Sequence, residues 1–173
     1  MKKSDINPMP AYFDRYIHLT DEVELKEALS ISAEELNQLP IDQWKAIGNK
    51  VYAPGKWTIK DILQHMIDTE RIFAYRALCF ARGEAARMPS FDEEEYGRNT
   101  NANQRTLEDL IDELKINRAS FIAMYQSFTD EMLLRNGLSF KGIYSVLAIG
   151  FIIAGHQRWH LNVIQERYSG LAN

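Results

Sequence analysis

Apolar residues recur every three or four positions between residues 107 and 125, which is the repeat of a helix with one buried face. Thr106 followed by Asp109 forms a capping pattern at the start of this segment and predicts a helix from there to about Phe128. The apolar stripe consists of Leu107, Leu110, Ile111, Leu114, Phe121, Ile122 and Tyr125. Such a stripe must be covered by other apolar surfaces, so the chain has to supply further elements that pack around it.

Three further helices are expected, over residues 21–39, over residues 58–82, and from between 143 and 145 to about 168. Capping boxes begin the first two of these, at Asp21 with Glu24 and at Thr58 with Asp61. No segment shows the alternation of apolar and polar residues that a half-buried strand would have. The sequence therefore predicts an all-α fold, a four-helix bundle.

The connection between the second and third helices is long and polar, and covers residues 83–105 with the acidic run 92–95. A connection of this length in a compact protein is usually functional or crosses the fold. We expect it to carry the chain from one end of the bundle to the other, so that the second and third helices run parallel. Residues 1–173 are read as a single domain with an irregular lead-in over residues 1–12.

Charge and composition exclude several classes of function. The chain has 173 residues and a net charge of −4, which argues against a protein that binds the phosphates of nucleic acids. No apolar run reaches the ~18 residues of a membrane-spanning helix, and the first residues have no apolar stretch typical of a secretory signal. With Cys79 as its only cysteine the chain forms no internal disulfide, and a cytoplasmic location is expected.

Two histidines of the last helix, His156 and His160, are four residues apart and so lie on the same helical face. At about 100° per residue, the positions near His156 on the helical wheel are mostly apolar. They are Ser145, Ile149, Ile152, His160, Val163 and Arg167. The pair has two interpretations at this point, which are metal ligands or two histidines satisfied by ordinary hydrogen bonds. The glutamate general base of HExxH metalloproteases is absent, because Gln157 follows His156.

His65, in the second helix, strengthens the metal hypothesis because its face is also partly apolar. Three histidines on the inward faces of two helices are what a metal ion with an open coordination position requires. Asp68 and Thr69 lie one turn from His65 and are candidates for orienting its ring. Arg118 interrupts the apolar stripe of the third helix, and we expect it to pair with Asp68 or Glu70.

Several motifs of the chain resemble the DinB-like superfamily of metal-dependent bundle proteins, the damage-inducible family rather than the DNA polymerase of that name. The motifs are residues 52–58 (YAPGKWT), 65–76 (HMIDTERIFAYR), 89–96 (PSFDEEEY) and 155–160 (GHQRWH). The resemblance covers nearly everything from Tyr12 onward. It implies an up-down-down-up bundle with a long crossover between helices two and three, often as a homodimer.

The same resemblance implies a divalent metal, zinc or nickel, held by one histidine of the second helix and two of the fourth. These positions are His65, His156 and His160 in this chain. Family members commonly have two adjacent histidines in the last motif, and Trp159 occupies the first of those places here, which leaves the ligand set intact.

Better-known members of the family are S-transferases of low-molecular-weight thiols and a thiol-dependent isomerase. A thiol S-transferase acting on small electrophiles is therefore the first hypothesis, since a metal held by three neutral histidines favours the thiolate of a bound thiol. A metal-dependent hydrolase, an isomerase and a metal-binding or ligand-binding protein without turnover are the alternatives. The expected partner is a small molecule, and neither a nucleic acid nor a membrane.

Overall fold

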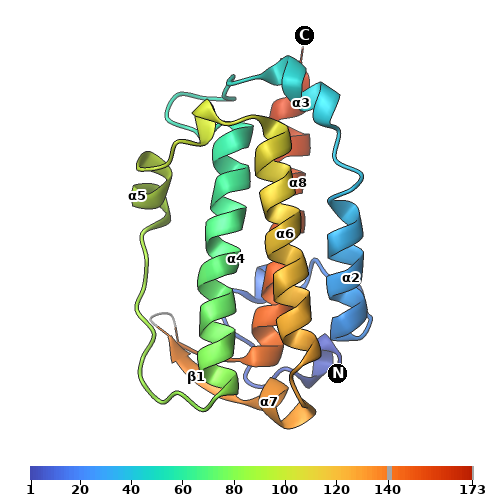
Figure 1. The fold of residues 1–173 in the computed structure, drawn as a ribbon, viewed down its shortest axis with the longest axis vertical. Coiled ribbons are helices and arrows are strands. Elements are labelled where there is room, and N and C mark those ends of the chain that lie inside the picture. The colour runs from blue at the N-terminus through green and yellow to red at the C-terminus, as the bar shows by residue number, and fades with distance from the viewer. Residues whose placement is uncertain (140–141, 173) are drawn as a thin grey trace.

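Four long helices form the body of the protein in the computed structural model, which describes residues 1–139 and 142–172. They are α2 (Leu25–Glu35), α4 (Ile59–Ala81), α6 (Leu107–Gln126) and α8 (Val146–Tyr168). In Figure 1, α2 and α8 begin at the lower end of the bundle, whereas α4 and α6 begin at the upper end. The predicted four-helix bundle is therefore present. Residues 140, 141 and 173 of the predicted domain lie outside the described residues.

Local capping side chains set the first residue of α4. The hydroxyl of Thr58 accepts a hydrogen bond from the backbone N–H of Asp61 at 3.1 Å, and the Asp61 carboxylate accepts one from the backbone N–H of Thr58 at 2.9 Å. Each bond satisfies a backbone group that has no partner within the helix. Thr106 and Ser145 cap α6 and α8 in a similar way. The predicted starts of α4 and α6 are confirmed, whereas α8 begins at Val146, just after the predicted range of 143–145, which belongs to a strand.

The prediction for the first helix was wrong at both ends. The helix α2 begins at Leu25, and no side chain caps it at Glu24. Asp21 instead pairs with Arg158 of α8 over 2.6 Å, so a distant partner takes the side chain that the capping box needed. At the other end the backbone tightens after Glu35, where Gln38 N–H bonds to the carbonyl of Glu35. Hydrogen bonds of this shorter spacing commonly close a helix.

The crossover is more structured than its polar sequence indicated. It contains the short helix α5 (Glu93–Arg98) and the 3₁₀ turn η2 (Ala102–Gln104). Asp92 caps α5 by accepting hydrogen bonds from the backbone N–H groups of Glu94 and Glu95. In Figure 1 this segment rises along the outer side of α4, from its lower end to the start of α6.

A two-stranded antiparallel sheet precedes α8, and the expectation that the chain has no strand was wrong. Strand β1 (Asn136–Ser139) pairs with β2 (Gly142–Ser145), with Asn136 opposite Ser145 and Leu138 opposite Ile143. Strands of four residues are too short to show a convincing alternation in the sequence. The short helix α7 (Asp130–Leu134) leads into β1 and is capped by Thr129.

Short elements cover the two ends of the bundle. The 3₁₀ turn η1 (Lys3–Asp5) and helix α1 (Asp14–Ile17) lie before α2, helix α3 (Ile41–Ile47) follows it, and the turn η3 (Ser169–Leu171) follows α8. Helix α1 packs against α8, which brings an N-terminal segment to the middle of the last helix. The lead-in predicted to be irregular thus contains one short turn, and the segment after it helps to build the site described below.

The first half of α8 is the most apolar part of the chain and is buried on every side. All residues from 146 to 157 are buried, because α1, α2, α4 and α7 surround them. Because this part of the helix is covered on every side, its apolar residues are not confined to one face. Within the described residues, no helix is long and apolar enough to cross a membrane.

Polar side chains cross the bundle between two apolar clusters. Arg118 of α6 donates two hydrogen bonds to the Glu70 carboxylate of α4, at 2.9 and 3.0 Å. It also donates to the hydroxyl of Ser32 at 2.6 Å and to the side-chain oxygen of Gln157 at 2.9 Å. Arg118 is 1% exposed and Glu70 is 2% exposed. Of the two partners predicted for Arg118, Glu70 is the correct one, and the network joins all four long helices.

Candidate metal centre

The three predicted histidines lie together inside the bundle. His65 extends from α4, and His156 and His160 extend from successive turns of α8. The Nε2 atom of His156 lies 3.1 Å from that of His65 and 3.0 Å from that of His160. One potential ligand atom from each of the three rings lies within 4.8 Å of the others.

Hydrogen bonding alone does not satisfy this arrangement. A ring nitrogen has one in-plane position, which carries either a proton or a lone pair. The Nε2 atom of His156 is therefore able to form a good hydrogen bond with only one of its two neighbours. Bonds of about 2.0–2.1 Å from one zinc ion would place neighbouring nitrogens ~3 Å apart. The two Nε2–Nε2 distances at His156, 3.0 and 3.1 Å, are close to this spacing.

Burial keeps the three rings neutral, which is the form that binds a metal. It lowers the pKa of His65 to about 4. Burial, together with the neighbouring His65, lowers the pKa of His160 to about 3. The pKa of His156 is also well below its ordinary value, through burial first and then through His160, His65 and Arg118. At neutral pH each ring thus has an unprotonated nitrogen.

The rotation of α8 that aims His156 at His65 is held by the polar residues beside it. Gln157 is fully engaged, since its amide group donates to the carbonyl of Ser32 at 2.8 Å and to Glu35 at 2.9 Å. Arg158 pairs with the same Glu35 at 2.7 Å. These bonds place consecutive residues of α8 against α2, so His156 has to face the other way, toward α4. Gln157 therefore has a structural role at the position where HExxH enzymes have their base.

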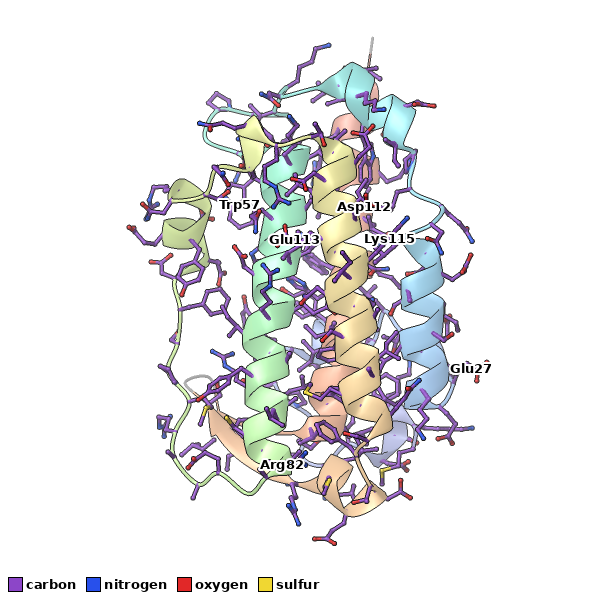
Figure 2. All side chains as sticks on the ribbon, in the orientation of Figure 1. Glu27, Trp57, Arg82, Asp112, Glu113 and Lys115 are labelled. Atoms are coloured by element: carbon purple, nitrogen blue, oxygen red, sulfur yellow. The ribbon has the colours of Figure 1, made fainter. Side chains whose placement is uncertain are left out.

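Aromatic rings enclose the histidines on two sides. The ring of Tyr16 meets His156 edge to face, with their centroids 5.1 Å apart, and Trp57 covers His65 at 4.9 Å. Figure 2 shows Trp57 at the upper end of α4, on the side of α5. Gly97 of α5 lies against the Trp57 indole, so that a Cβ there would approach it to 3.2 Å. The hydroxyl of Tyr168 donates to the carbonyl of Trp57, which holds the indole at this end.

A small cavity of about 60 Å³ opens beside His65 and His156. Such a volume has room for a few water molecules. Aromatic residues form much of its wall, and Tyr16, Thr69 and Glu93 are among the lining residues that carry a hydroxyl or a carboxylate. Burial raises the pKa of Tyr16 to about 12, with a contribution from Glu93, so its hydroxyl stays a donor at neutral pH.

The hydroxyl of Thr69 is the polar group of this cavity that most needs a partner. Thr69 is 5% exposed, and its Oγ1 is the one buried side-chain polar atom in residues 1–139 and 142–172 without a hydrogen bond. A buried hydroxyl without a partner costs free energy, so such groups usually contact a water molecule or a ligand. Thr69 is among the residues that line the cavity, so its hydroxyl is a candidate contact for a polar group bound there.

A second cavity, of about 180 Å³, lies on the His160 side of the cluster. Trp57, Lys56, Glu94 and Tyr168 contribute to its wall. The histidine cluster therefore lies between two openings. Successive residues of α5 contribute to both, Glu93 to the smaller cavity and Glu94 to the larger.

Comparisons with known proteins identify the family and the fold of the chain. The profile of the DinB superfamily matches residues 24–164. The chain belongs to the DinB superfamily. Comparison with curated proteins gave no significant match. Among solved structures, the chain is similar to YfiT from Bacillus subtilis, described as a probable metal-dependent hydrolase with an unusual four-helix bundle topology. The TM-score is 0.66 at 16% identity, over 89% of this chain and 84% of YfiT, which establishes a shared fold.

The two residues predicted to orient the histidines of this DinB-superfamily chain have different surroundings. Thr69 lines the cavity beside His65. Asp68 accepts a hydrogen bond from Gln64 at 2.9 Å and lines a polar cleft with Arg105. Within the described part of the chain, no hydrogen bond joins Asp68 to a histidine ring. Its orienting role remains a prediction.

Tyr16 and Glu93 were not among the predicted site residues. One weak signal pointed to Glu93, namely the acidic run in a crossover long enough to be functional. Tyr16 had none, because its place depends on the packing of α1 against α8. His18 is exposed. Cys79 packs against buried apolar residues. Neither residue lines either of the two cavities.

Proposed function

We propose that the protein is a metal-dependent hydrolase of small molecules, with a divalent metal held by His65, His156 and His160. The convergence of three neutral ring nitrogens, which hydrogen bonds alone do not satisfy, carries this proposal. When bound, such a metal supplies a Lewis acid and acidifies a water molecule at its open position. The description of YfiT as a probable metal-dependent hydrolase supports the same reaction class.

Glu93 is the residue we assign as general base. Its carboxylate lines the small cavity together with His65 and His156, and it comes from the crossover rather than from a position next to a ligand. There it accepts a proton from water as the water attacks the substrate, and returns it to the leaving group. Glu93 thus takes the role that the sequence around His156 does not provide.

Tyr16 and Thr69 are assigned to bind the reacting group of the substrate. Both present hydroxyl groups to the cavity, and such donors stabilise an oxygen that gains negative charge during acyl transfer. The rings of Phe13, Phe73 and Phe91 form apolar walls that limit access of bulk water. These walls favour a substrate with an apolar or aromatic part near the bond that breaks.

Thiol S-transfer remains the second candidate. It is favoured by the position of the histidines between two cavities, since a transferase needs separate places for a thiol and an electrophile. Hydrolysis is preferred because it requires only water beside the substrate, which suits a cavity of about 60 Å³ that includes a carboxylate.

A panel of small aryl esters and amides, assayed with metal-free and metal-reconstituted protein, tests the proposal. We expect turnover that requires metal, and a loss of kcat of about 100-fold or more in Glu93→Gln, within the range of general base catalysis. Turnover only when a low-molecular-weight thiol and a chromogenic electrophile are both present would favour the transferase. Metal binding without turnover in either assay would make the protein a binding protein.

Two further expectations from the family resemblance stay proposals. The helix directions in Figure 1 support the up-down-down-up order. A homodimer is proposed from the resemblance alone, and light scattering coupled to size exclusion tests it.

A further inference from the structure

A groove of about 340 Å³ lies on the outer side of α4, beneath the crossover and next to the candidate metal centre. Its wall is mostly apolar and aromatic, with Ile72, Tyr75, Met88, Phe91 and Tyr96 among its members. Two arginines, Arg71 and Arg76, also line it, and no acidic residue does so within the described part of the chain. This is unusual in a chain with a net charge of −4.

The two arginines differ in how their charge is balanced. Arg71 pairs with Glu113 of α6 at 2.6 Å, and Figure 2 shows Glu113 between α4 and α6. Arg76 is only 6% exposed, yet it forms none of the ion pairs found among the described residues. Removing a charged group from water without an opposite charge is costly.

The groups around Arg76 are neutral. Its Nη2 donates to the carbonyl of Pro89 at 2.8 Å, and its Nη1 lies 3.4 Å from the hydroxyl of Tyr144. Its guanidinium carbon lies 4.9 Å from the ring centroid of Phe73 and 5.9 Å from that of Phe91. Aromatic faces attract a cation without neutralising it. A guanidinium has five N–H groups, and two of them form hydrogen bonds among the described residues.

Arg118 shows what this chain does with a buried arginine that has a purely structural role. Both oxygens of the Glu70 carboxylate accept hydrogen bonds from its guanidinium group, and Ser32 and Gln157 accept one more each. Arg76 is buried to a comparable extent, but it lines a groove, whereas Arg118 is paired with a carboxylate. The contrast indicates that the opposite charge at Arg76 comes from outside the chain.

We propose that this groove binds a small organic anion, with a carboxylate at Arg76 and an apolar or aromatic body against Phe91, Met88 and Tyr96. A planar guanidinium matches the two oxygens of a carboxylate, which makes a carboxylate the fitting head group. The apolar walls supply the contacts for the body. This site is separate from the three histidines and does not require a metal.

The position of the groove also predicts the shape of the substrate, and this inference rests on the proposed function. Phe91 lines both the groove and the small cavity beside His65. His65, Thr69, Phe73 and Arg76 follow spacings of four, four and three residues, so they share one face of α4. The Cα atom of Arg76 lies ~16 Å along the helix from that of His65. A substrate that reaches both is an elongated acid whose reacting bond is remote from its carboxylate.

Metal-free protein, titrated by NMR with 3-phenylpropionate and with its neutral amide, tests the groove without any assay of activity. We expect the carboxylate to bind about tenfold more tightly than the amide or better, because the charged hydrogen bonds form only with the acid. Arg76→Gln should remove this preference, and Arg76→Lys should keep part of it. Arg82→Gln is the matched control, since Arg82 directly follows the same helix, lies outside the groove and carries the same charge.

The outcomes separate the groove from the metal centre. Equal binding of acid and amide by the native protein, or unchanged acid binding by Arg76→Gln, would overturn the proposal. If Arg76→Gln fails to fold, the comparison of acid and amide in the native protein and in Arg76→Lys decides. Acid binding that appears only after metal loading would show a carboxylate on the metal and would also overturn the groove. Acid binding by the metal-free protein, together with no hydrolase activity in the metal-reconstituted protein, would support the groove and refute the proposed function.

Discussion

Arg118 donates a hydrogen bond across 2.9 Å to the side-chain oxygen of Gln157, the residue that follows His156 in α8. The same guanidinium is held by Glu70 of α4, five residues after His65. The two helices that carry the three histidines are thus connected through one buried cation. The connection lies beside the histidines and controls how the two helices face each other.

Removing one partner of this network should destabilise the protein strongly. We expect Glu70→Ala to lower the free energy of unfolding by about 3–5 kcal/mol, because it leaves the Arg118 charge buried without its carboxylate. Replacing both residues by leucine should cost less, since no charge is then left unpaired. Urea unfolding of the three proteins measures this.

The exposed pair Arg98–Glu95 is the control, and Arg98→Gln should leave the free energy of unfolding nearly unchanged. A Glu70→Ala protein as stable as the double leucine variant would contradict the account of the network.

The metal site gives the second prediction. Reconstituted protein should contain one divalent ion per chain, and His65→Ala, His156→Ala and His160→Ala should each lose most of it, because each removes one of three ligands. His18→Ala, which changes an exposed histidine outside the cluster, should bind metal like the native protein. Elemental analysis after dialysis measures the content. Full metal content and unchanged affinity in His65→Ala would refute the proposed ligand set.

The stability of the metal-free protein should fall with pH in a defined range. The pKa values of His65 and His160 are lowered to about 4 and about 3, whereas a histidine of the unfolded chain titrates near its ordinary 6.5. Below pH 6.5 the unfolded chain binds protons that the folded chain does not, so the stability contributed by the neutral rings is lost as pH falls. At pH 5 the loss is on the order of 2 kcal/mol for each ring.

Urea unfolding at pH 7 and pH 5 tests this dependence. A variant with His65→Gln and His160→Gln has no titrating group at these two positions, so its stability should change less between the two pH values. An equal change in the native and double-variant proteins would assign the pH dependence to other groups.

The parts of the fold that could be predicted depend on neighbouring residues. The start of α4 follows from Thr58 and Asp61, which are three residues apart and cap the helix whatever packs against it. Asp21 shows the opposite case, because its partner Arg158 is 137 residues away and overrides the local capping pattern. Strands β1 and β2 were missed for a similar reason, since four-residue segments carry too little pattern.

The residues of the candidate site also differ in whether their positions depend on neighbouring residues or on distant contacts. His156 and His160 are one helical turn apart, so their common direction follows from the helix alone. The partly apolar face of His65 made it a candidate partner, and the resemblance implied the same residue. Nothing near Glu93 in the sequence tells where the crossover crosses α4, and that position depends partly on contacts such as Gly97 against Trp57. Tyr16 depends on a close approach of two helices that only the three-dimensional structure reveals.

The unpaired hydroxyl of Thr69 should affect catalysis more than stability. Thr69→Val keeps the shape and removes the hydroxyl, so it should slightly stabilise the protein, because a buried polar atom without a partner is lost. If the hydroxyl donates to the substrate, kcat should fall about tenfold or more while metal content stays the same. Thr69→Ser should retain most of the activity. A Thr69→Val protein with native kcat would leave the hydroxyl without a role in the reaction.

Gly155 should be required for the position of Tyr16. A Cβ at residue 155 would lie 1.8 Å from the carbonyl oxygen of Tyr16, so any side chain there forces α1 away from α8. We expect Gly155→Ala to lower the free energy of unfolding by about 2–3 kcal/mol, as overpacking does. It should also separate the Tyr16 ring from His156 and slow hydrolysis, with the three histidines still able to bind metal. Gly170→Ala is the control, because a Cβ there meets no atom within 4 Å and should leave stability and activity unchanged. Urea unfolding, metal analysis and the ester assay on both variants test this prediction. Native stability in Gly155→Ala would show that α1 does not need this close contact.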